Sequence, residues 1–329
     1  MKGAAALRNP YYDGPTSDHF DGLRFFNPPG PARDKGLADI LRWQLNGQKA
    51  RWPDKVAITP ALPDQRVEDI RVTMVGHATL LIQGAGLNIL TDPVWAERAS
   101  PLSFAGPKRV TEPGIRFADL PPIDAVLLSH NHYDHCELGT LKRLVEAHDP
   151  LIVTPLGNDM LMRKAVGQAR LFAGDWGDQV ALGNDFAVTI VPANHWSSRT
   201  TRDRRMALWG GFVLQSGGRT LYFAGDTGYS GGRIFADLQR FGPVDIALIP
   251  IGAYAPEWFM KDQHCNPEDA VRIALTLEAR RAIGIHWGTY QLTDEAREEP
   301  AERLAAELRR RGIAEERFVP AVPGGVYDG

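Results

Sequence analysis

The sequence predicts a layered α/β fold, and three features support this prediction. Short apolar runs of strand length recur between residues 70 and 285, and stretches with apolar residues at helical spacing separate several of them. Polar side chains repeatedly follow the last residue of such a run. The chain has 329 residues and 43% hydrophobic content, so it can bury one large core.

The first 66 residues are expected to form an N-terminal extension packed on a body of residues 67–329. They are rich in Gly, Pro, Asn and Asp, and they contain one candidate amphipathic helix over residues 37–45. The first eight residues hold too short an apolar run for a signal peptide. No window approaches the roughly 18 apolar residues that cross a bilayer. A cytoplasmic location is therefore expected.

A meander is expected to open the first sheet. Apolar and polar residues alternate over residues 70–74, and two apolar runs, residues 79–83 and 87–91, flank a Gly-Ala-Gly turn. Later strands are expected at residues 125–129, 151–154, 186–191, 211–215, 220–224, 246–250 and 282–285.

Helices are expected between and after these strands. Apolar residues recur at helical spacing from Leu138 to Val145. Asn266 has the features of an N-cap, because a proline and two acidic residues follow it, and it opens a helix that runs to about residue 278. A last helix ends near Gly312. The apolar stripes of these helices are expected to be core contacts.

The segment from residue 130 to 135 is the strongest functional signal in the sequence. It reads His130-Asn131-His132-Tyr133-Asp134-His135 and follows the apolar run of residues 124–128. Imidazole nitrogens and carboxylate oxygens bind zinc and its neighbours in the first transition row. Four such groups within six residues lie close together, so this loop is expected to hold metal. The alternative is a polar surface loop without a ligand.

Three more candidate ligands each follow a strand-like run. His195 comes after residues 186–192, Asp226 after residues 220–224 and His286 after residues 282–285. Taken alone, each has an ordinary explanation as a hydrogen-bonded core histidine, a turn former or a helix cap. Their repeated position favours a common site, because strand ends of a layered α/β fold meet at one edge of its sheets. A pair of metals about 3.5 to 4 Å apart also needs more than four donors.

With these residues the chain resembles the metallo-β-lactamase superfamily of dinuclear metallohydrolases. Within it, the chain is most similar to the group of phospholipases D that hydrolyse N-acylphosphatidylethanolamine, over about residues 71–291. The motifs are Val75-Gly76-His77-Ala78-Thr79, Gly106-Pro107-Lys108-Arg109, Phe223-Ala224-Gly225-Asp226-Thr227-Gly228-Tyr229 and Ile285-His286-Trp287-Gly288-Thr289, with residues 91–93, 98–101, 120–126 and 249–254. The resemblance implies an αββα sandwich in which two mixed sheets are flanked by helices.

The resemblance also implies two zinc ions and assigns their ligands. One metal would bind His130, His132 and His195, the second would bind Asp134, His135 and His286, and Asp226 would bridge them. Ligand chemistry favours zinc and leaves iron and manganese open. The implied function is that of a phosphodiesterase of the phospholipase D type, acting on N-acylphosphatidylethanolamine or a related phospholipid. The nucleophile would be a hydroxide that bridges the metals.

Further roles follow from the same resemblance. Asp134 is expected to orient the attacking water or accept its proton. His264 is expected to contact the substrate phosphate or assist the leaving group, with a capping or core role as the alternative. His77 and Asp92 are expected to hold the ligands in orientation from behind.

A substrate groove is expected near the metals. The residues that would line it, or touch a lipid surface, are Phe104, Tyr254, Trp258, Phe259, Met260 and Gln263. Ordinary core packing is the alternative for the apolar ones. Ser103-Phe104 stands where animal members of the group have Gln-Tyr, which leaves head-group recognition open.

Two other functions stay open on the sequence alone. The same metal pair can hydrolyse a lactone, an amide or a sugar-phosphate ester, because the fold alone does not choose the bond. A non-catalytic metal-binding module, or an iron-loaded redox module served by a partner, is the third hypothesis. Under the first hypothesis the partner is a phospholipid or another phosphodiester, with peripheral contact at the inner face of the membrane. The oligomeric state is left undetermined.

Composition argues against several other classes of protein. The 37 basic and 40 acidic residues give a net charge of −3, and no basic block stands out beyond residues 309–311, so nothing predicts nucleic-acid binding. Cys136 and Cys265 are too few for a disulfide framework and are expected to be free thiols. His19 and His148 lie in polar surroundings and receive no role.

Overall fold

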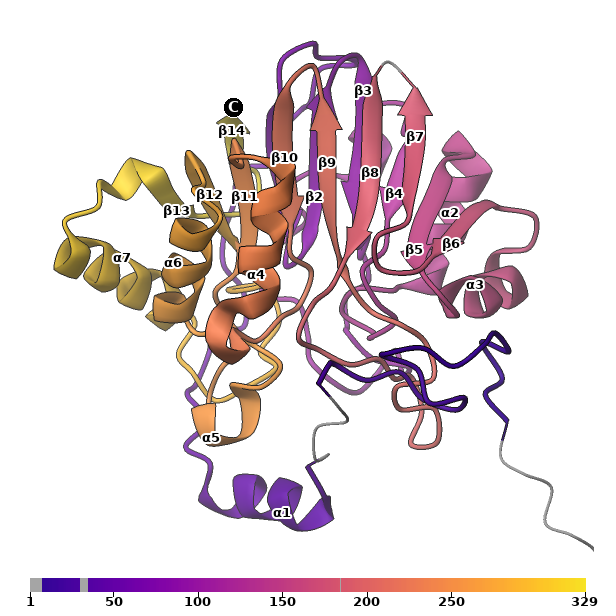
Figure 1. The fold of residues 1–329 in the computed structure, drawn as a ribbon. Helices are drawn as coiled ribbons and strands as arrows, with labels where there is room; N and C mark the ends of the chain where they lie inside the picture. The colour runs from indigo at the N-terminus through magenta and orange to yellow at the C-terminus, as the bar shows by residue number, and fades with distance from the viewer. Residues whose placement is uncertain (1–7, 30–34, 184) are drawn as a thin grey trace, which may run out of the picture.

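The structure is a computed structural model that describes residues 8–29, 35–183 and 185–329. Within these residues, two seven-stranded sheets pack face to face and helices lie on their outer surfaces (Figure 1). The layers follow the order helix, sheet, sheet, helix, which confirms the αββα sandwich. The first seven residues, which bear on the expected absence of a signal peptide, lie outside the described part of the chain.

The first sheet has the strand order β14-β1-β2-β3-β4-β5-β6. Its strands are β1 (Arg71–Gly76), β2 (Thr79–Gly84), β3 (Leu87–Thr91), β4 (Ala125–Leu127), β5 (Leu151–Pro155), β6 (Arg170–Gly174) and β14 (Val326–Asp328). The predicted meander is confirmed, since β1, β2 and β3 pair antiparallel. Strands β3 to β6 run parallel, so their carboxyl ends meet at one edge.

The second sheet has the order β13-β12-β11-β10-β9-β8-β7. Its strands are β7 (Gln179–Gly183), β8 (Phe186–Val191), β9 (Gly211–Ser216), β10 (Arg219–Phe223), β11 (Ile246–Pro250), β12 (Arg281–Ile285) and β13 (Phe318–Pro320). β10 to β13 run parallel, and β9 runs antiparallel to both β8 and β10. The carboxyl ends of β8, β10, β11 and β12 therefore share one edge.

Helices cover the outer face of each sheet. The helices are α1 (Leu37–Asn46), α2 (Leu138–His148), α3 (Asn158–Val166), α4 (Arg233–Asp237), α5 (Glu257–Met260), α6 (Pro267–Thr276) and α7 (Glu299–Arg311). α2 and α3 pack on the first sheet, and α4, α6 and α7 pack on the second. As predicted, Asn266 caps α6 and α7 ends before Gly312. None of the described helices combines the length and apolar character that a membrane crossing requires.

The main core lies between the two sheets. Strands place alternate side chains on opposite faces, so each strand sends half of its residues inward. Met74 and Ile82 of the first sheet pack with Phe212, Phe223 and Leu248 of the second, and each of these side chains is at most 1% exposed. This buried apolar layer fixes the sheets against each other, and it thereby fixes the loops at their shared edge.

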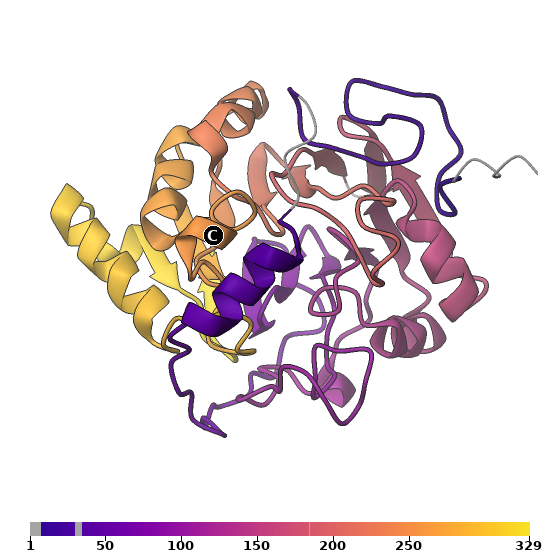
Figure 2. The ribbon, with the colours of Figure 1, turned by 90° about the horizontal axis from the view of Figure 1, so that it is seen from below.

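The N-terminal residues lie against the end of the sandwich. Figures 1 and 2 show α1 below the lower edge of the two sheets. The Trp43 indole N–H donates to Asp294 Oδ2 at 2.7 Å, and the Trp52 indole N–H donates to the Glu295 carbonyl at 2.9 Å. The boundary at residue 66 stays an interpretation of the sequence.

The sequence prediction misses the strands β6, β7, β13 and β14 and the helices α3, α4 and α5. β13 and β14 have three residues each, which is too few to show alternation. β6 and β7 each end a sheet, and the residues of β7 alternate between exposed and half-buried. Cys136 and Cys265 are buried free thiols, as predicted.

Candidate metal centre

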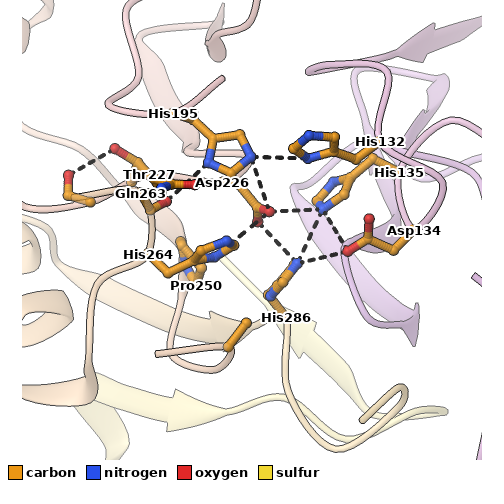
Figure 3. Close-up of polar contacts among 12 residues, drawn as sticks. His132, Asp134, His135, His195, Asp226, Thr227, Pro250, Gln263, His264 and His286 are labelled. Atoms are coloured by element: carbon orange, nitrogen blue, oxygen red, sulfur yellow. Dashed lines mark hydrogen bonds and ion pairs between the residues drawn. The ribbon is translucent and has the colours of Figure 1, made fainter. Parts of the chain in front are cut away.

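Loops from both sheets bring the candidate ligands together at one edge of the sandwich. The hexad follows β4 and precedes α2, while His195, Asp226 and His286 follow β8, β10 and β12. Figure 3 shows the side chains from these loops converging on the Asp226 carboxylate. The convergence follows from strand direction, because the carboxyl ends of parallel neighbours meet at the same edge of a sheet.

A first group of donors consists of His130, His132 and His195. The Nδ1 atom of His132 lies 2.9 Å from His130 Nε2 and 3.2 Å from His195 Nε2. The His130 and His195 rings are buried. Three imidazole nitrogens thus face one point.

A second group consists of Asp134, His135 and His286. His286 Nε2 lies 3.1 Å from His135 Nε2 and 3.3 Å from Asp134 Oδ2. His135 Nε2 lies 3.5 Å from the same carboxylate oxygen. His77 adds a fourth donor atom to this group, within 4.8 Å of the others.

Asp226 lies between the two groups. Its Oδ2 is 3.2 Å from His135 Nε2 and 3.7 Å from His195 Nε2, and its Oδ1 is 3.1 Å from His286 Nε2. One carboxylate therefore reaches donors of both groups, which is the position that a bridging ligand needs. The side chain is 2% exposed, so solvent does not compete for its charge.

Hydrogen bonds behind two of the imidazoles fix which nitrogen faces the centre. His135 Nδ1 lies 2.6 Å from an Asp92 carboxylate oxygen, and His195 Nδ1 lies 3.0 Å from the Gln263 carbonyl oxygen. Both partners accept, so in the neutral ring the proton sits on Nδ1 and the Nε2 lone pair points inward. Lone pairs about 3 Å apart repel unless a proton or a metal cation lies between them. The donor set therefore fits metal ions, and its nitrogen and carboxylate composition suits zinc.

Asp92 and His77 make the supporting contacts expected of them. Asp92 accepts from the Ser129 backbone N–H at 2.7 Å, from Ser129 Oγ at 2.6 Å and from His135. His77 Nε2 lies 2.9 Å from Asp134 Oδ2, and its ring packs on His286 with a centroid distance of 3.8 Å. Thr289 Oγ1 accepts the His77 backbone N–H at 3.0 Å. These contacts restrict the rotation of the ligands they touch.

Burial and mutual charge shift the pKa of every group in the centre. Burial lowers the pKa of His130 and His195 well below the usual value, and that of His132 to about 4. Neutral imidazoles are the form that binds metal. For His286, burial opposes protonation, but the Asp226 and Asp134 carboxylates outweigh it and raise the pKa to about 9.

The two carboxylates stay ionised despite their burial. Burial alone would raise the pKa of Asp134 and Asp226, but the neighbouring histidines, His135 first among them, hold both well below the usual value. The same carboxylates, with Asp92, raise the pKa of His135 well above its usual value against the effect of burial. The cluster thus holds two carboxylate charges, which the protonated His135 and His286 rings balance and which bound metal cations would balance in their place.

His264 lies at the side of this cluster. Its Nδ1 is 3.8 Å from Asp226 Oδ2, its ring centroid is 5.1 Å from that of His195, and the residue is 8% exposed. Burial lowers the pKa of His264 to about 4. Nδ1 is buried and has no hydrogen-bond partner among the residues that the structure describes. A neutral imidazole with an unused nitrogen therefore faces the candidate site.

The residues expected to line a groove lie in different surroundings. Phe104 is 77% exposed, and Trp258 is 37% exposed. Phe259 packs on the Trp43 ring at 5.0 Å, and Met260 is buried. Core packing thus accounts for Met260, while Phe104 and Trp258 face solvent.

The structure buries Tyr254, which is expected from the sequence to line the groove. Tyr254 is 1% exposed, and its hydroxyl donates to Glu299 at 2.8 Å. Glu299 is partly exposed, but Tyr254 itself contributes almost no surface to a groove. Gln263 accepts from the Trp196 indole N–H and lines a small cavity beside His195.

Two supporting residues were missed by sequence reasoning. Ser129 directly precedes the hexad, so its position beside the candidate ligands could have flagged it. Asn27 donates from Nδ2 to the His195 carbonyl oxygen at 3.0 Å. It is 168 residues from His195 along the chain, and no motif surrounds it, so the sequence offers no signal for this contact.

Comparison with known families identifies the fold group. A family model described as "Beta-lactamase superfamily domain" matches residues 87–287, which is more than half of the chain. The chain belongs to this superfamily. The matched residues include all seven candidate metal ligands of the sequence analysis.

Curated relatives narrow the group further. The chain is 38% identical over 266 residues to N-acyl-phosphatidylethanolamine-hydrolyzing phospholipase D 1 of Caenorhabditis elegans, covering 78% of this chain and 75% of the relative. It is 35% identical over 240 residues to the mitochondrial enzyme of that name from Saccharomyces cerevisiae, covering 71% of this chain and 51% of the relative. A metal-dependent hydrolase of Ligilactobacillus salivarius is 31% identical, covering 67% and 86%. The superfamily member described here is thus a metal-dependent hydrolase similar to these phospholipases.

Solved structures agree on the fold. The metallo hydrolase Igni18 of Ignicoccus hospitalis superposes with a TM-score of 0.57 at 18% identity, covering 78% of this chain and 97% of that one. An isothiocyanate hydrolase from Delia radicum gut bacteria superposes with a TM-score of 0.60 at 23% identity, covering 78% of this chain and 98% of that one. At these identities the likeness concerns the fold and leaves the substrate open.

Proposed function

We propose that this superfamily member is a dinuclear zinc phosphodiesterase of the phospholipase D type. Its substrate would be N-acylphosphatidylethanolamine or a related phospholipid, cleaved to an N-acylethanolamine and a phosphatidic acid. The observation that carries the proposal is the convergence of two donor groups on the Asp226 carboxylate. The similarity to two relatives named for this hydrolysis supports the choice of substrate.

The ligand assignment follows the two groups. One metal would be held by His130, His132 and His195, the other by Asp134, His135 and His286, and both by Asp226. When bound, two divalent cations would lower the pKa of a coordinated water and neutralise charge on phosphoryl oxygens. The protein supplies the fixed positions of the seven side chains, set by the rigid strand ends.

Two further histidines have distinct tasks in this scheme. His77 holds Asp134 Oδ2 at 2.9 Å, so that carboxylate cannot turn away when substrate enters. His264 directs an unused nitrogen toward the centre from the side of Asp226. We assign His264 to contact with the substrate phosphate or the leaving oxygen, because it is buried and without a competing partner.

Exposed apolar side chains near this end of the sandwich support action at a lipid surface. On α1, Leu41 is 56% exposed and Leu45 is 82% exposed, and their spacing of four residues puts them on one helix face. Trp258 of α5 is their neighbour, since the Arg42 guanidinium lies 4.6 Å above its ring. Exposed leucines beside an indole suit shallow insertion into a lipid interface. A cytoplasmic location with peripheral contact stays a prediction.

A cavity beside the hexad is the candidate site for the lipid head group. It has a volume of about 510 Å³ and is lined by Tyr133 of the hexad, Leu102 and Ser103 among others. Arg199 also lines it, and its guanidinium lies 3.9 Å above the Tyr133 ring. The lining is mixed polar and apolar, with the cations Arg98 and Arg199 and the anions Glu97 and Glu137. The two guanidinium groups suit a phosphodiester near the start of its acyl chain.

The central experiment combines metal analysis with product analysis. Purified protein is assayed for metal content and then for hydrolysis of N-acylphosphatidylethanolamine, phosphatidylcholine and a lactone, before and after chelation. The expected result is two zinc ions per chain and release of N-acylethanolamine that chelation abolishes and zinc restores. Turnover of the lactone with no phospholipid product would overturn the proposed substrate.

A matched pair of variants tests the role of His264. His264→Ala should lose most turnover while keeping two metals, because the ring is not among the assigned ligands. His148→Ala at the end of α2 removes a half-buried histidine away from the candidate centre and should behave as wild type. Equal turnover of the two variants would remove His264 from the mechanism.

The lipid surface has its own test. Leu45→Asp should reduce co-sedimentation with phospholipid vesicles and leave hydrolysis of a short-chain, water-soluble substrate unchanged. Leu275→Asp is the control, because Leu275 is 45% exposed near the end of α6. Equal vesicle binding by wild type and Leu45→Asp would refute this contact.

A further inference from the structure

An N-terminal segment, residues 8–29, docks beside the first group of donors. It carries Phe20 and Phe25, both 1% exposed, which pack with Leu208 and Trp209 in a small core of their own. The Phe25 backbone N–H donates to the Arg205 carbonyl at 2.7 Å. The segment is thus fastened to the loop that follows His195 along the chain.

The segment reaches the candidate centre through Asn27. Its Nδ2 donates to the His195 carbonyl oxygen at 3.0 Å, and its Oδ1 accepts from the Trp209 indole N–H at 3.1 Å. The same indole N–H lies 2.9 Å from the Ala193 carbonyl. Both ends of the Asn27 amide are therefore used, one on the candidate ligand and one on the core that supports it.

His195 depends on such contacts because of its place in the chain. β8 ends at Val191, so His195 lies in a loop beyond the ladder of the sheet. Its ring is oriented by the bond from Nδ1 to the Gln263 carbonyl. Its backbone N–H donates to the Ala193 carbonyl at 3.1 Å, and its own carbonyl accepts from Asn27. A shift of this backbone would move Nε2 relative to His130 and His132.

We infer that Asn27 is a positioning residue for His195, and that the N-terminal segment is thereby part of the metal centre. This inference rests on the ligand assignment of the proposed function. Residues that hold a ligand in orientation set metal affinity, and their loss weakens binding by about 10- to 100-fold. The effect should concern the metal held by His130, His132 and His195, because Asn27 contacts no residue of the other group among its described hydrogen bonds.

Two substitutions separate positioning from docking. Asn27→Asp keeps the acceptor for the Trp209 indole but replaces the donor to the His195 carbonyl with a second oxygen, so docking persists and positioning is lost. Asn27→Ala removes both bonds. Asn9→Ala is the matched control, because the Asn9 amide also tethers the segment, to the Leu23 carbonyl at 2.9 Å and to the Met206 carbonyl at 2.7 Å.

The readout is the dissociation constant of each metal, measured on the full chain by competition with a chromogenic chelator. Cobalt substitution adds an absorption spectrum that reports the ligand geometry of each metal. Asn27→Asp and Asn27→Ala should weaken one of the two metals about 10- to 100-fold and alter its cobalt spectrum. The second metal should bind as in wild type, and Asn9→Ala should bind both metals as wild type does.

Each outcome separates this inference from the proposed function. If wild type binds no pair of metals, the ligand assignment itself fails. If wild type binds two and Asn27→Asp binds both equally well, the assignment stands and the role of Asn27 is refuted. If Asn9→Ala weakens the same metal as strongly, docking of the segment and not Asn27 is responsible, which also refutes the inference. Should Asn27→Ala fail to fold, Asn27→Asp carries the test.

Discussion

Asp92→Asn tests how the second group of donors is held. Asp92 is fully buried, and its carboxylate accepts three hydrogen bonds. Oδ1 accepts from the Ser129 backbone N–H at 2.7 Å, and Oδ2 accepts from Ser129 Oγ and from His135 Nδ1, each at 2.6 Å. Asparagine has the same shape but one acceptor oxygen and an NH₂ group. Either orientation of the amide therefore leaves a donor facing a donor.

The two orientations fail in different ways. With its oxygen toward His135, the amide points NH₂ at the Ser129 backbone N–H. With its oxygen toward that N–H, the NH₂ faces His135 Nδ1, and the ring avoids the clash by moving its proton to Nε2, where the lone pair for a metal is lost. Loss of one charge-assisted bond costs about 1.5 to 3 kcal/mol. Since about 1.4 kcal/mol is tenfold in an equilibrium constant, metal binding at this group should weaken about 10- to 100-fold.

Chelator competition measures this effect directly. The matched control is Asp245→Asn, because Asp245 also accepts several bonds, including the Thr220 backbone N–H at 2.9 Å. Asp245 lies at the start of β11, at the opposite end of the strand from the candidate site. The Asp245→Asn substitution should lower the stability of the protein without changing its metal affinity. Equal dissociation constants for wild type and Asp92→Asn, with both folded, would refute the idea that Asp92 fixes the His135 proton.

Three further predictions concern other parts of the chain. Gly76→Ala should lower the melting temperature, because Gly76 has φ +149° and a Cβ there would lie 2.8 Å from Arg109 Nη1. A variant that melts at the same temperature as wild type would contradict this. Burial alone would lower the pKa of His19, but Asp175 and Asp18 raise it, so docking of the N-terminal segment should be strongest below about pH 6.5 and weaken as pH rises through the raised pKa. The protection factors of the backbone amides of residues 19–27 should fall as pH rises in wild type. In His19→Gln they should not change with pH in this way. Metal removal should lower the free energy of unfolding by about 4 kcal/mol for each metal whose free concentration is a thousandfold above its dissociation constant, and denaturant titrations with and without chelator measure it.

The candidate ligands were predictable because each follows the end of a strand with a clear apolar pattern. His195, Asp226 and His286 lie where buried runs stop, and the direction of parallel strands brings such ends together. The hexad adds a dense local cluster of donors. These signals are local in the sequence, and a fold built from parallel neighbours turns them into one site.

Other features depend on contacts that local patterns cannot express. The sequence gives His19 no role, yet its Nε2 lies 2.7 Å from Asp175 and its ring stacks on Trp176 with a centroid distance of 4.5 Å. The motif at residues 249–254 places Tyr254 in the expected groove, but Tyr254 is 1% exposed and its hydroxyl donates to Glu299. In each case the partner is more than 40 residues away, so the contact exists only once the sandwich has formed.

One six-residue loop can serve both donor groups because the chain turns within it. A strand would send His130 and His132 to one face and would carry Asp134 to the same face. Instead, the backbone N–H groups of His135 and Cys136 both donate to the His132 carbonyl, at 3.1 and 2.8 Å, which closes a tight turn after His132. The turn swings Asp134 and His135 toward His286 while the first two histidines stay beside His195. Spacing in this loop therefore matters as much as residue type, because the turn decides which donor group each side chain joins.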